Sequence, residues 1–268
     1  DPHGMPSGGD WALQRQAAIT IEYASGIWIV ANLFTRLDGN AIIMNRFNRR
    51  HLIFDNEIVW NGDTAIASWG DTNGITFPIS ESEETSMGWD GTDGNQPRQV
   101  EIVANYVHEL GIWEKQSSFY FQGKSCLNVV AYNIFYNGPR AGINFNDGFG
   151  GGTQITRNLL FNTCRESGDH GFCFIFFFLN YLFIYLFIIS QFVHTHTFFF
   201  FFVRVGPFNS WDRQVYVTDV KYGYPSVIKQ WDYISYNFIL ANYNSIGAID
   251  NDDGSCFYQT HHNFFVYG

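Results

Sequence analysis

Three aspartates near the end of the chain are the densest group of side chains suited to acid–base chemistry. The turn AIDNDDGS contains Asp250, Asp252 and Asp253. Carboxylates held close together repel one another, so one takes up a proton and serves as an acid while its neighbour stays ionised as a base or nucleophile. We therefore predict that these three residues are catalytic. Two other interpretations stay open, a turn whose aspartates bond their own backbone and a Ca²⁺ site.

Other turns combine charged groups with aromatic side chains. The residues concerned are Glu166, Asp169 and His170 in CRESGDHG, Trp211, Asp212 and Arg213 in NSWDR, and Asp147 in INFNDG. We predict that Asp169 and His170 act in catalysis, although GDHG also fits a plain turn. The other five residues are predicted to bind substrate, because a guanidinium can hold a sugar carboxylate and an indole ring can stack on a pyranose face.

A repeated segment separates these turns and must position them. Each copy has a short run of β-branched or aromatic residues, then Asn, then two apolar positions and a polar, Gly-rich turn, as in VEIVANYVHELG and LNVVAYNIFYNGPRA. Such runs are typical of β-strands. The repeated asparagines are Asn32, Asn56, Asn105, Asn133, Asn158, Asn237 and Asn263.

The spacing of these asparagines predicts an all-β solenoid with rungs of about 25 residues. Their successive separations are 24, 49, 28, 25, 79 and 26 residues, and we interpret 49 as two units. No segment with helical periodicity follows the strands, so a right-handed parallel β-helix fits better than a leucine-rich repeat. Each Asn is expected to accommodate a bend with left-handed backbone geometry and to hydrogen-bond the equivalent Asn one rung away.

These rungs, together with ESGDHG, PFNSWDR and AIDNDDGS, resemble the pectin-lyase-like superfamily of right-handed parallel β-helices. They are most similar to uncharacterised members related to glycoside hydrolases, over nearly the whole chain outside residues 172–206. The resemblance implies a carbohydrate-active protein, with hydrolysis of a polysaccharide by a carboxylate pair as the leading activity. The superfamily also contains lyases and non-catalytic adhesins, so a Ca²⁺-assisted polysaccharide lyase and a non-catalytic glycan-binding surface protein remain alternatives.

Two mechanisms of that superfamily do not carry over to this sequence. Polygalacturonase-type members place a paired Asp turn before a His turn, whereas here His170 precedes Asp252 and Asp253. Lyase-type members use a basic residue with Ca²⁺, for which Arg165 and Arg213 are candidates, but no lyase motif matches. No cofactor is therefore predicted, with Ca²⁺ kept as the one alternative.

A Phe-rich apolar segment, residues 172–206, interrupts the repeat. Its first 22 residues, Phe172 to Val193, are long enough to cross a bilayer as a helix. One crossing would put the rungs on opposite sides of the membrane, where they could not stack. Thirteen Phe lie between Phe172 and Phe202, a composition typical of T-rich codons. We predict that 172–206 is a translated intron inside one truncated β-helix domain spanning 1–268. A lipid-facing insertion and a buried core element are the alternatives.

The 268 residues carry a formal net charge of −10. An acidic surface repels phosphate groups, so we expect no nucleic acid as a partner and no membrane contact unless 172–206 is genuine. The expected partner is a polysaccharide or glycan, and we expect a monomer at an extracellular or cell-surface location. The four cysteines lack metal-ligand spacing, so no metal site is predicted from them.

Overall fold

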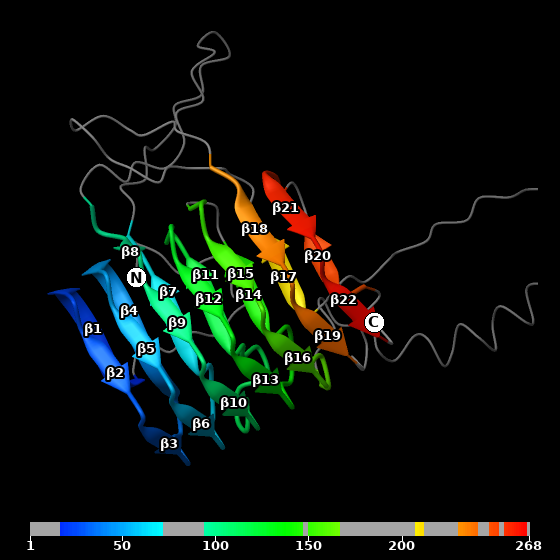
Figure 1. The fold of residues 1–268 in the computed structure, drawn as a ribbon. Helices are drawn as coiled ribbons and strands as arrows, with labels where there is room; N and C mark the ends of the chain where they lie inside the picture. Colours follow the sequence, from blue (N-terminus) through cyan, green and yellow to red (C-terminus); the bar gives the residue numbers. More distant parts are fainter. Residues whose placement is uncertain are drawn as a thin grey trace, which may run out of the picture.

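The residues that the structure describes form twenty-two β-strands joined by turns and contain no helix. This computed structural model describes residues 17–71, 94–146, 150–166, 207–211, 230–240, 247–251 and 255–266. The strands form three parallel sheets that run side by side along the molecule, from β1–β3 in blue to β20–β22 in red (Figure 1). The predicted all-β parallel solenoid is confirmed.

Each rung of the solenoid contributes one strand to each of three sheets, which we call A, B and C. Sheet A contains β1 (Ala17–Ser25), β4 (Asn40–Arg49), β7 (Ile66–Trp69), β11 (Tyr120–Gly123), β14 (Ile143–Asn146), β17 (Phe208–Trp211) and β20 (Ile249–Asn251), with β8 (Pro97–Arg98) also paired to β4. Sheet B contains β2 (Trp28–Val30), β5 (Leu52–Phe54), β9 (Glu101–Val103), β12 (Val129–Ala131), β15 (Gln154–Thr156), β18 (Asp232–Ser235) and β21 (Tyr258–His261). Sheet C contains β3 (Leu33–Thr35), β6 (Glu57–Val59), β10 (Tyr106–His108), β13 (Ile134–Tyr136), β16 (Leu159–Phe161), β19 (Phe238–Leu240) and β22 (Phe264–Val266). The chain passes from A to B to C in each of these seven rungs.

The core lies inside the solenoid, between the three sheets. Most strands of sheets B and C have three residues, and alternate residues of a strand point to opposite faces, so the middle residue points inward. Ile53 and Ile102 of sheet B and Ile58 and Phe135 of sheet C are fully buried in this way. Burying such a side chain stabilises the fold by about 1.5–3 kcal/mol. One apolar residue per strand therefore suffices, because the rungs above and below complete its surroundings.

An asparagine ladder joins all seven rungs at the bend between sheets B and C. At each step the side-chain Nδ2 donates to the Oδ1 of the Asn on the next rung at 2.9–3.1 Å, and the same Oδ1 accepts a main-chain N–H from the rung below. The ladder consists of Asn32, Asn56, Asn105, Asn133, Asn158, Asn237 and Asn263. The predicted hydrogen bond between equivalent asparagines is confirmed.

The left-handed residue of this bend is the one before the ladder Asn, so this part of the sequence interpretation needs correction. The angle φ is 55° at Ala31, 56° at Asp55 and 58° at Tyr132. The ladder Asn instead supports the bend with its side chain. Asn56 Nδ2, for example, also donates to the Phe54 carbonyl at 3.1 Å.

The interpretation of the 49-residue spacing as two units is wrong. Asn56 and Asn105 bond each other directly, so the residues between them form one rung with a long connection between β7 and β8. Asn158 and Asn237 also bond directly across 79 residues, so this stretch is one rung as well. Residues 172–206 belong to the connection between β16 and β17 and lie outside the described residues, so their intron origin stays a prediction.

Candidate functional site

The outer face of sheet A changes from apolar to polar along the solenoid. One outward-facing position recurs on successive rungs, because the strands are paired in register. From the second rung to the seventh, this position holds Ile43, Ala67, Phe121, Asn144, Asn209 and Asp250. We call the last three residues, Asn144, Asn209 and Asp250, the polar row.

The apolar half of this face is a second small core outside the solenoid. Phe121 packs there with Trp69, Ala141 and Cys164, and the rings of Trp69 and Phe121 stack with centroids 5.8 Å apart. Ala141 and Cys164 belong to connections that lead from sheet C to sheet A. These connections therefore pack against the apolar half of the outer face of sheet A.

The polar row is buried but only partly hydrogen-bonded. The exposed fractions are 0% for Asn144, 2% for Asn209 and 9% for Asp250. Asn209 Nδ2 donates to Asp250 Oδ2 at 3.3 Å. Within the part of the chain that the structure describes, Asn144 has no hydrogen-bond partner at Nδ2 or at Oδ1. Leaving a buried polar group unpaired costs about 1–3 kcal/mol.

A buried guanidinium and a buried thiol lie near Asp250. Arg140 is 2% exposed, and its Nη1 donates to Gln116 Oε1. Burial raises the pKa of Cys164 to about 12, with smaller opposing effects from a Thr163 hydrogen bond and the Arg140 charge and a raising effect from Asp250. Both charges act on the same thiol, so Arg140 and Asp250 belong to one electrostatic environment. The thiol is neutral near pH 7 and is therefore not an activated nucleophile.

The structure describes three of the residues predicted for the site. Asp250 lies in the polar row, and Trp211 is the last residue of β17, described by its main chain only. Glu166 is half exposed and forms an ion pair with Lys115, with Nζ and Oε2 2.8 Å apart. The other predicted residues lie outside the described residues, and their roles stay predictions: Asp147, Asp169, His170, Asp212, Arg213, Asp252 and Asp253.

The predicted residues divide between the two ends of the sheet A strands. Asp147, Asp212 and Asp252 come directly after the last residues of β14, β17 and β20 in the sequence. Glu166 lies where the chain returns toward the start of these strands, and its main-chain N–H donates to the Pro139 carbonyl at 3.0 Å. A four-residue strand is roughly 13 Å long. Glu166 is therefore separated from the strand ends that precede the predicted aspartates.

Sequence analysis missed Asn144, Arg140 and Cys164 and gave Asn209 no role. A signal existed in the sheet A strands themselves. Aligned by register, IASW and YFQG are followed by INFN, FNSW and IDN, so the second position changes from Ala and Phe to Asn and Asp. A polar residue at an outward strand position usually faces water and attracts no attention. Here these polar residues are buried instead.

Neither a metal-binding cluster nor a membrane-spanning helix is found among the described residues. Within them, no three His, Cys, Asp or Glu side chains gather closely enough to hold a metal ion. No helix in these ranges is long and apolar enough to cross a bilayer. The candidate Ca²⁺ interpretation of Asp250, Asp252 and Asp253 falls mostly outside them and stays untested.

Comparison with known proteins gives one structural likeness. No family model matches the chain, and no curated protein matches it in sequence. A solved structure described as a glycoside hydrolase matches with a TM-score of 0.56 at 13% sequence identity. The match covers 94% of this chain and 38% of that glycoside hydrolase, so this chain spans well under half of its length. At this identity the likeness shows a shared fold.

Proposed function

We propose that this protein binds a glycan across the outer face of sheet A and hydrolyses it with a carboxylate pair that includes Asp250. The observation that carries the proposal is the polar row itself. Asp250, its most exposed member at 9%, accepts a hydrogen bond from Asn209, and among the described residues the buried Asn144 amide beside them has no hydrogen-bond partner. A sugar hydroxyl both donates and accepts a hydrogen bond, so it complements an amide. The likeness in fold to a glycoside hydrolase supports the same ligand class.

The surroundings of Asp250 fit the ionised member of such a pair. The Asn209 amide donates to Asp250 Oδ2, and a hydrogen bond to a carboxylate favours its charged form. Asp250 would then act as nucleophile or base, and a protonated carboxyl of Asp252 or Asp253 would act as acid. Retention needs the two carboxyl groups about 5–5.5 Å apart, and inversion about 6.5–9.5 Å.

Two alternatives use the same surface. A Ca²⁺-assisted lyase would place the metal between the aspartates and a sugar carboxylate, with Arg213 as the base. A non-catalytic glycan-binding protein would use the polar row and Trp211 for retention alone. The polar row favours neither of them over hydrolysis, because amides bind sugar hydroxyls in all three cases.

A polysaccharide panel tests the proposal. The full chain is incubated with neutral and acidic polysaccharides while reducing ends and the absorbance of unsaturated uronates are followed together. Reducing ends alone identify a hydrolase, and both signals together identify a lyase. Neither signal, combined with retention on a glycan column, identifies a binding protein.

The variant Asp250→Asn tests the site. It should lower hydrolysis at least about a hundredfold, because acid–base and nucleophilic groups contribute factors of this order. Asp55→Asn is the matched control, since Asp55 is exposed at a bend where Asn is also tolerated. Full hydrolysis by Asp250→Asn would overturn the assignment of Asp250.

A further inference from the structure

Two arginines on adjacent rungs lie next to each other at the corner between sheets A and B. Strand β8 pairs with β4 beyond the end of β7, and the register places Arg98 opposite Arg49. Neighbouring strands are about 4.8 Å apart, so the two guanidinium groups start from adjacent positions. Arg98 is 6% exposed, and Arg49 is partly buried.

Neither guanidinium has a carboxylate partner within the residues that the structure describes. Arg49 donates to the main-chain carbonyls of Asn48, Gln96 and Gly94, the last at 2.8 Å. Arg98 donates from Nη2 to Gln96 Oε1 at 2.9 Å, while its buried Nε has no hydrogen-bond partner among the described residues. Burial, followed by the charge of Arg98, lowers the pKa of Arg49 to about 10, so the Arg49 guanidinium is still charged at neutral pH.

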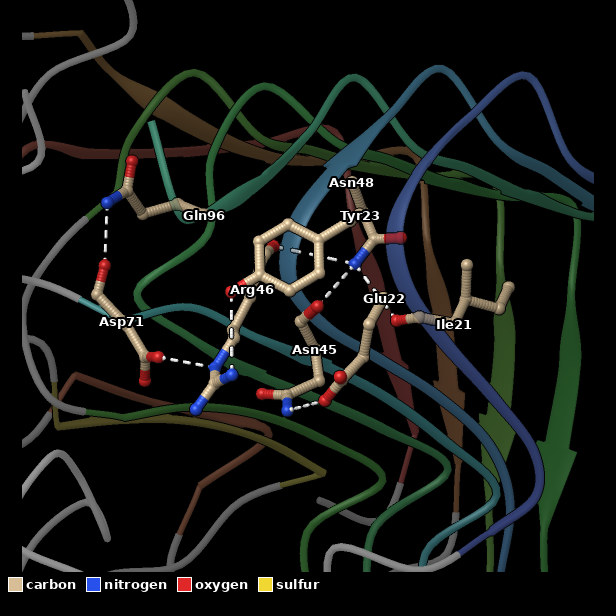
Figure 2. A network of polar contacts seen from close by, with 8 residues as sticks. All are labelled: Ile21, Glu22, Tyr23, Asn45, Arg46, Asn48, Asp71 and Gln96. Carbon is tan, nitrogen blue, oxygen red and sulfur yellow. Dashed lines mark hydrogen bonds and ion pairs between the residues drawn. The ribbon is translucent and has the colours of Figure 1, made fainter. Parts of the chain in front are cut away.

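The neighbouring carboxylates are used by other side chains. Figure 2 shows Asp71 Oδ2 accepting from Arg46 Nε at 2.8 Å and Glu22 accepting from Asn45 Nδ2. The positive charge of Arg49 and Arg98 is therefore not compensated by these acids, although the chain carries a net charge of −10.

We propose that Arg49 and Arg98 bind one oxyanion, the carboxylate or sulfate group of an acidic glycan. A guanidinium presents paired N–H donors that match the oxygens of such a group. An unpaired charge in a buried position destabilises the fold, and a bound oxyanion offsets this while accepting a hydrogen bond from Arg98 Nε.

The arginine pair and the polar row lie on the same solenoid, which suggests that one acidic glycan contacts both. The pair lies on the second and third rungs, and the polar row lies on the fifth to seventh. At about 4.8 Å per rung, the two are roughly 10–24 Å apart along the solenoid. The registers align the polar row with Ile43 of β4, and Arg49 lies six residues further along that strand, so the two sites are also up to roughly 20 Å apart across sheet A. A polysaccharide that reaches both must therefore cross sheet A obliquely, over several sugar units. This inference rests on the proposed glycan site and extends it, because it makes the substrate acidic.

The experiment is an anion titration of the full chain that requires no turnover. Sulfate, acetate, galacturonate and an oligogalacturonate are added at constant ionic strength, and Tm and calorimetric heat are recorded. A ligand that binds the folded state alone raises Tm in proportion to its affinity. We expect saturable binding of these anions, tightest for the oligogalacturonate, and none for a neutral oligosaccharide of equal length at this corner.

Arg98→Gln should weaken anion binding roughly tenfold or more, since it removes charged hydrogen bonds. Arg98→Lys keeps the charge but lacks the paired N–H donors of a guanidinium. Its affinity for anions should therefore lie between those of Arg98→Gln and the original chain. The matched control is Arg157→Gln, which removes the same charge. Arg157 has no ion-pair partner in the described ranges and lies over the rings of Tyr132 and Tyr236. This control should bind anions within twofold of the original chain.

The outcomes separate the two proposals. Absence of saturable binding by the original chain, or equal loss in Arg98→Gln and Arg157→Gln, would overturn the oxyanion site whatever the polysaccharide panel gives. Binding of sulfate but not of sugar acids would keep the oxyanion site and overturn its assignment to a glycan. Anion binding without any hydrolysis would leave this site standing while the catalytic proposal fails.

Discussion

Asn56 Nδ2 donates to Asn105 Oδ1 at 3.0 Å, although 49 residues separate the two asparagines in the sequence. The contact is the same as that between Asn133 and Asn158, which are 25 residues apart. The Asn–Asn contact at the bend therefore aligns adjacent rungs whatever the length of chain between them. The long connections can then differ freely from rung to rung.

The middle of the ladder should contribute strongly to stability. Asn133→Ala removes an acceptor for two N–H groups of Asn105 and a donor to Asn158 and Ile102. We expect the free energy of unfolding to fall by roughly 2–4 kcal/mol, because these partners are left buried and unpaired. Urea denaturation measures this. Asn32→Ala, at the exposed end of the ladder, is the control and should lose about 1 kcal/mol or less; equal losses in both variants would contradict a cooperative ladder.

Asn144 should lower the stability of the fold while contributing to glycan binding. Asn144→Leu keeps the branching at Cγ and removes two buried polar atoms that have no partner among the described residues, so the free energy of unfolding should rise by about 1–2 kcal/mol. Glycan retention should be lost at the same time, because the ligand loses its amide partner. Thermal denaturation and affinity electrophoresis measure the two effects. A destabilised variant that still binds glycan would show that Asn144 is structural.

Cys164 should be inert and should make stability sensitive to alkaline pH. Burial raises the pKa of its thiol from 9.0 to about 12. Above pH 9 the unfolded chain loses a proton that the folded chain retains, so stability falls as pH rises, by at most about 1.4 kcal/mol per pH unit for this group. Urea denaturation from pH 8 to 10.5 should show a shallower decline for Cys164→Ala. At pH 8, mass spectrometry should find a thiol reagent on the exposed Cys256 and not on Cys164.

The message encoding the protein should lack the codons for residues 172–206. The direct bond between Asn158 and Asn237 closes its rung whatever lies between them, so the deletion is compatible with the ladder. Sequencing the mature transcript across Arg165 to Gln214 tests this, with Gly171 expected to run into Pro207. A chain without 172–206 should keep its β-sheet circular dichroism and its unfolding midpoint. Phe-rich codons in the message would end the intron hypothesis.

The solenoid could be predicted because the same combination of residue types recurs in each rung. An apolar strand, a left-handed residue and an Asn recur together, as in Val130, Tyr132 and Asn133, and each group leaves a sequence signal. Rung length could not be predicted, since the residues between one strand and the next need not repeat any pattern. The unit count failed at Asn105 for this reason.

The candidate site was less predictable than the fold. Asn144 has the sequence context of any outward strand residue, and nothing in that context predicts that it is fully buried. Arg140 occurs in a turn, NGPRA, that reads as solvent-exposed. Asp250 could be predicted because it stands with Asp252 and Asp253 in the densest group of carboxylates in the sequence, although the structure places it in strand β20 and not in a turn.

The hydrogen bond between Asn158 and Asn237 closes a rung of 79 residues, and the entropic cost of that closure is small. The entropic cost of closing a flexible connection grows with the logarithm of its length, by only about 0.6 kcal/mol for each doubling. Lengthening a rung from 25 to 79 residues therefore costs roughly 1 kcal/mol, less than burying one aliphatic side chain returns. A stack of this kind can acquire new surface at its corners with little loss of stability, and substrate range can change there while the interior stays the same.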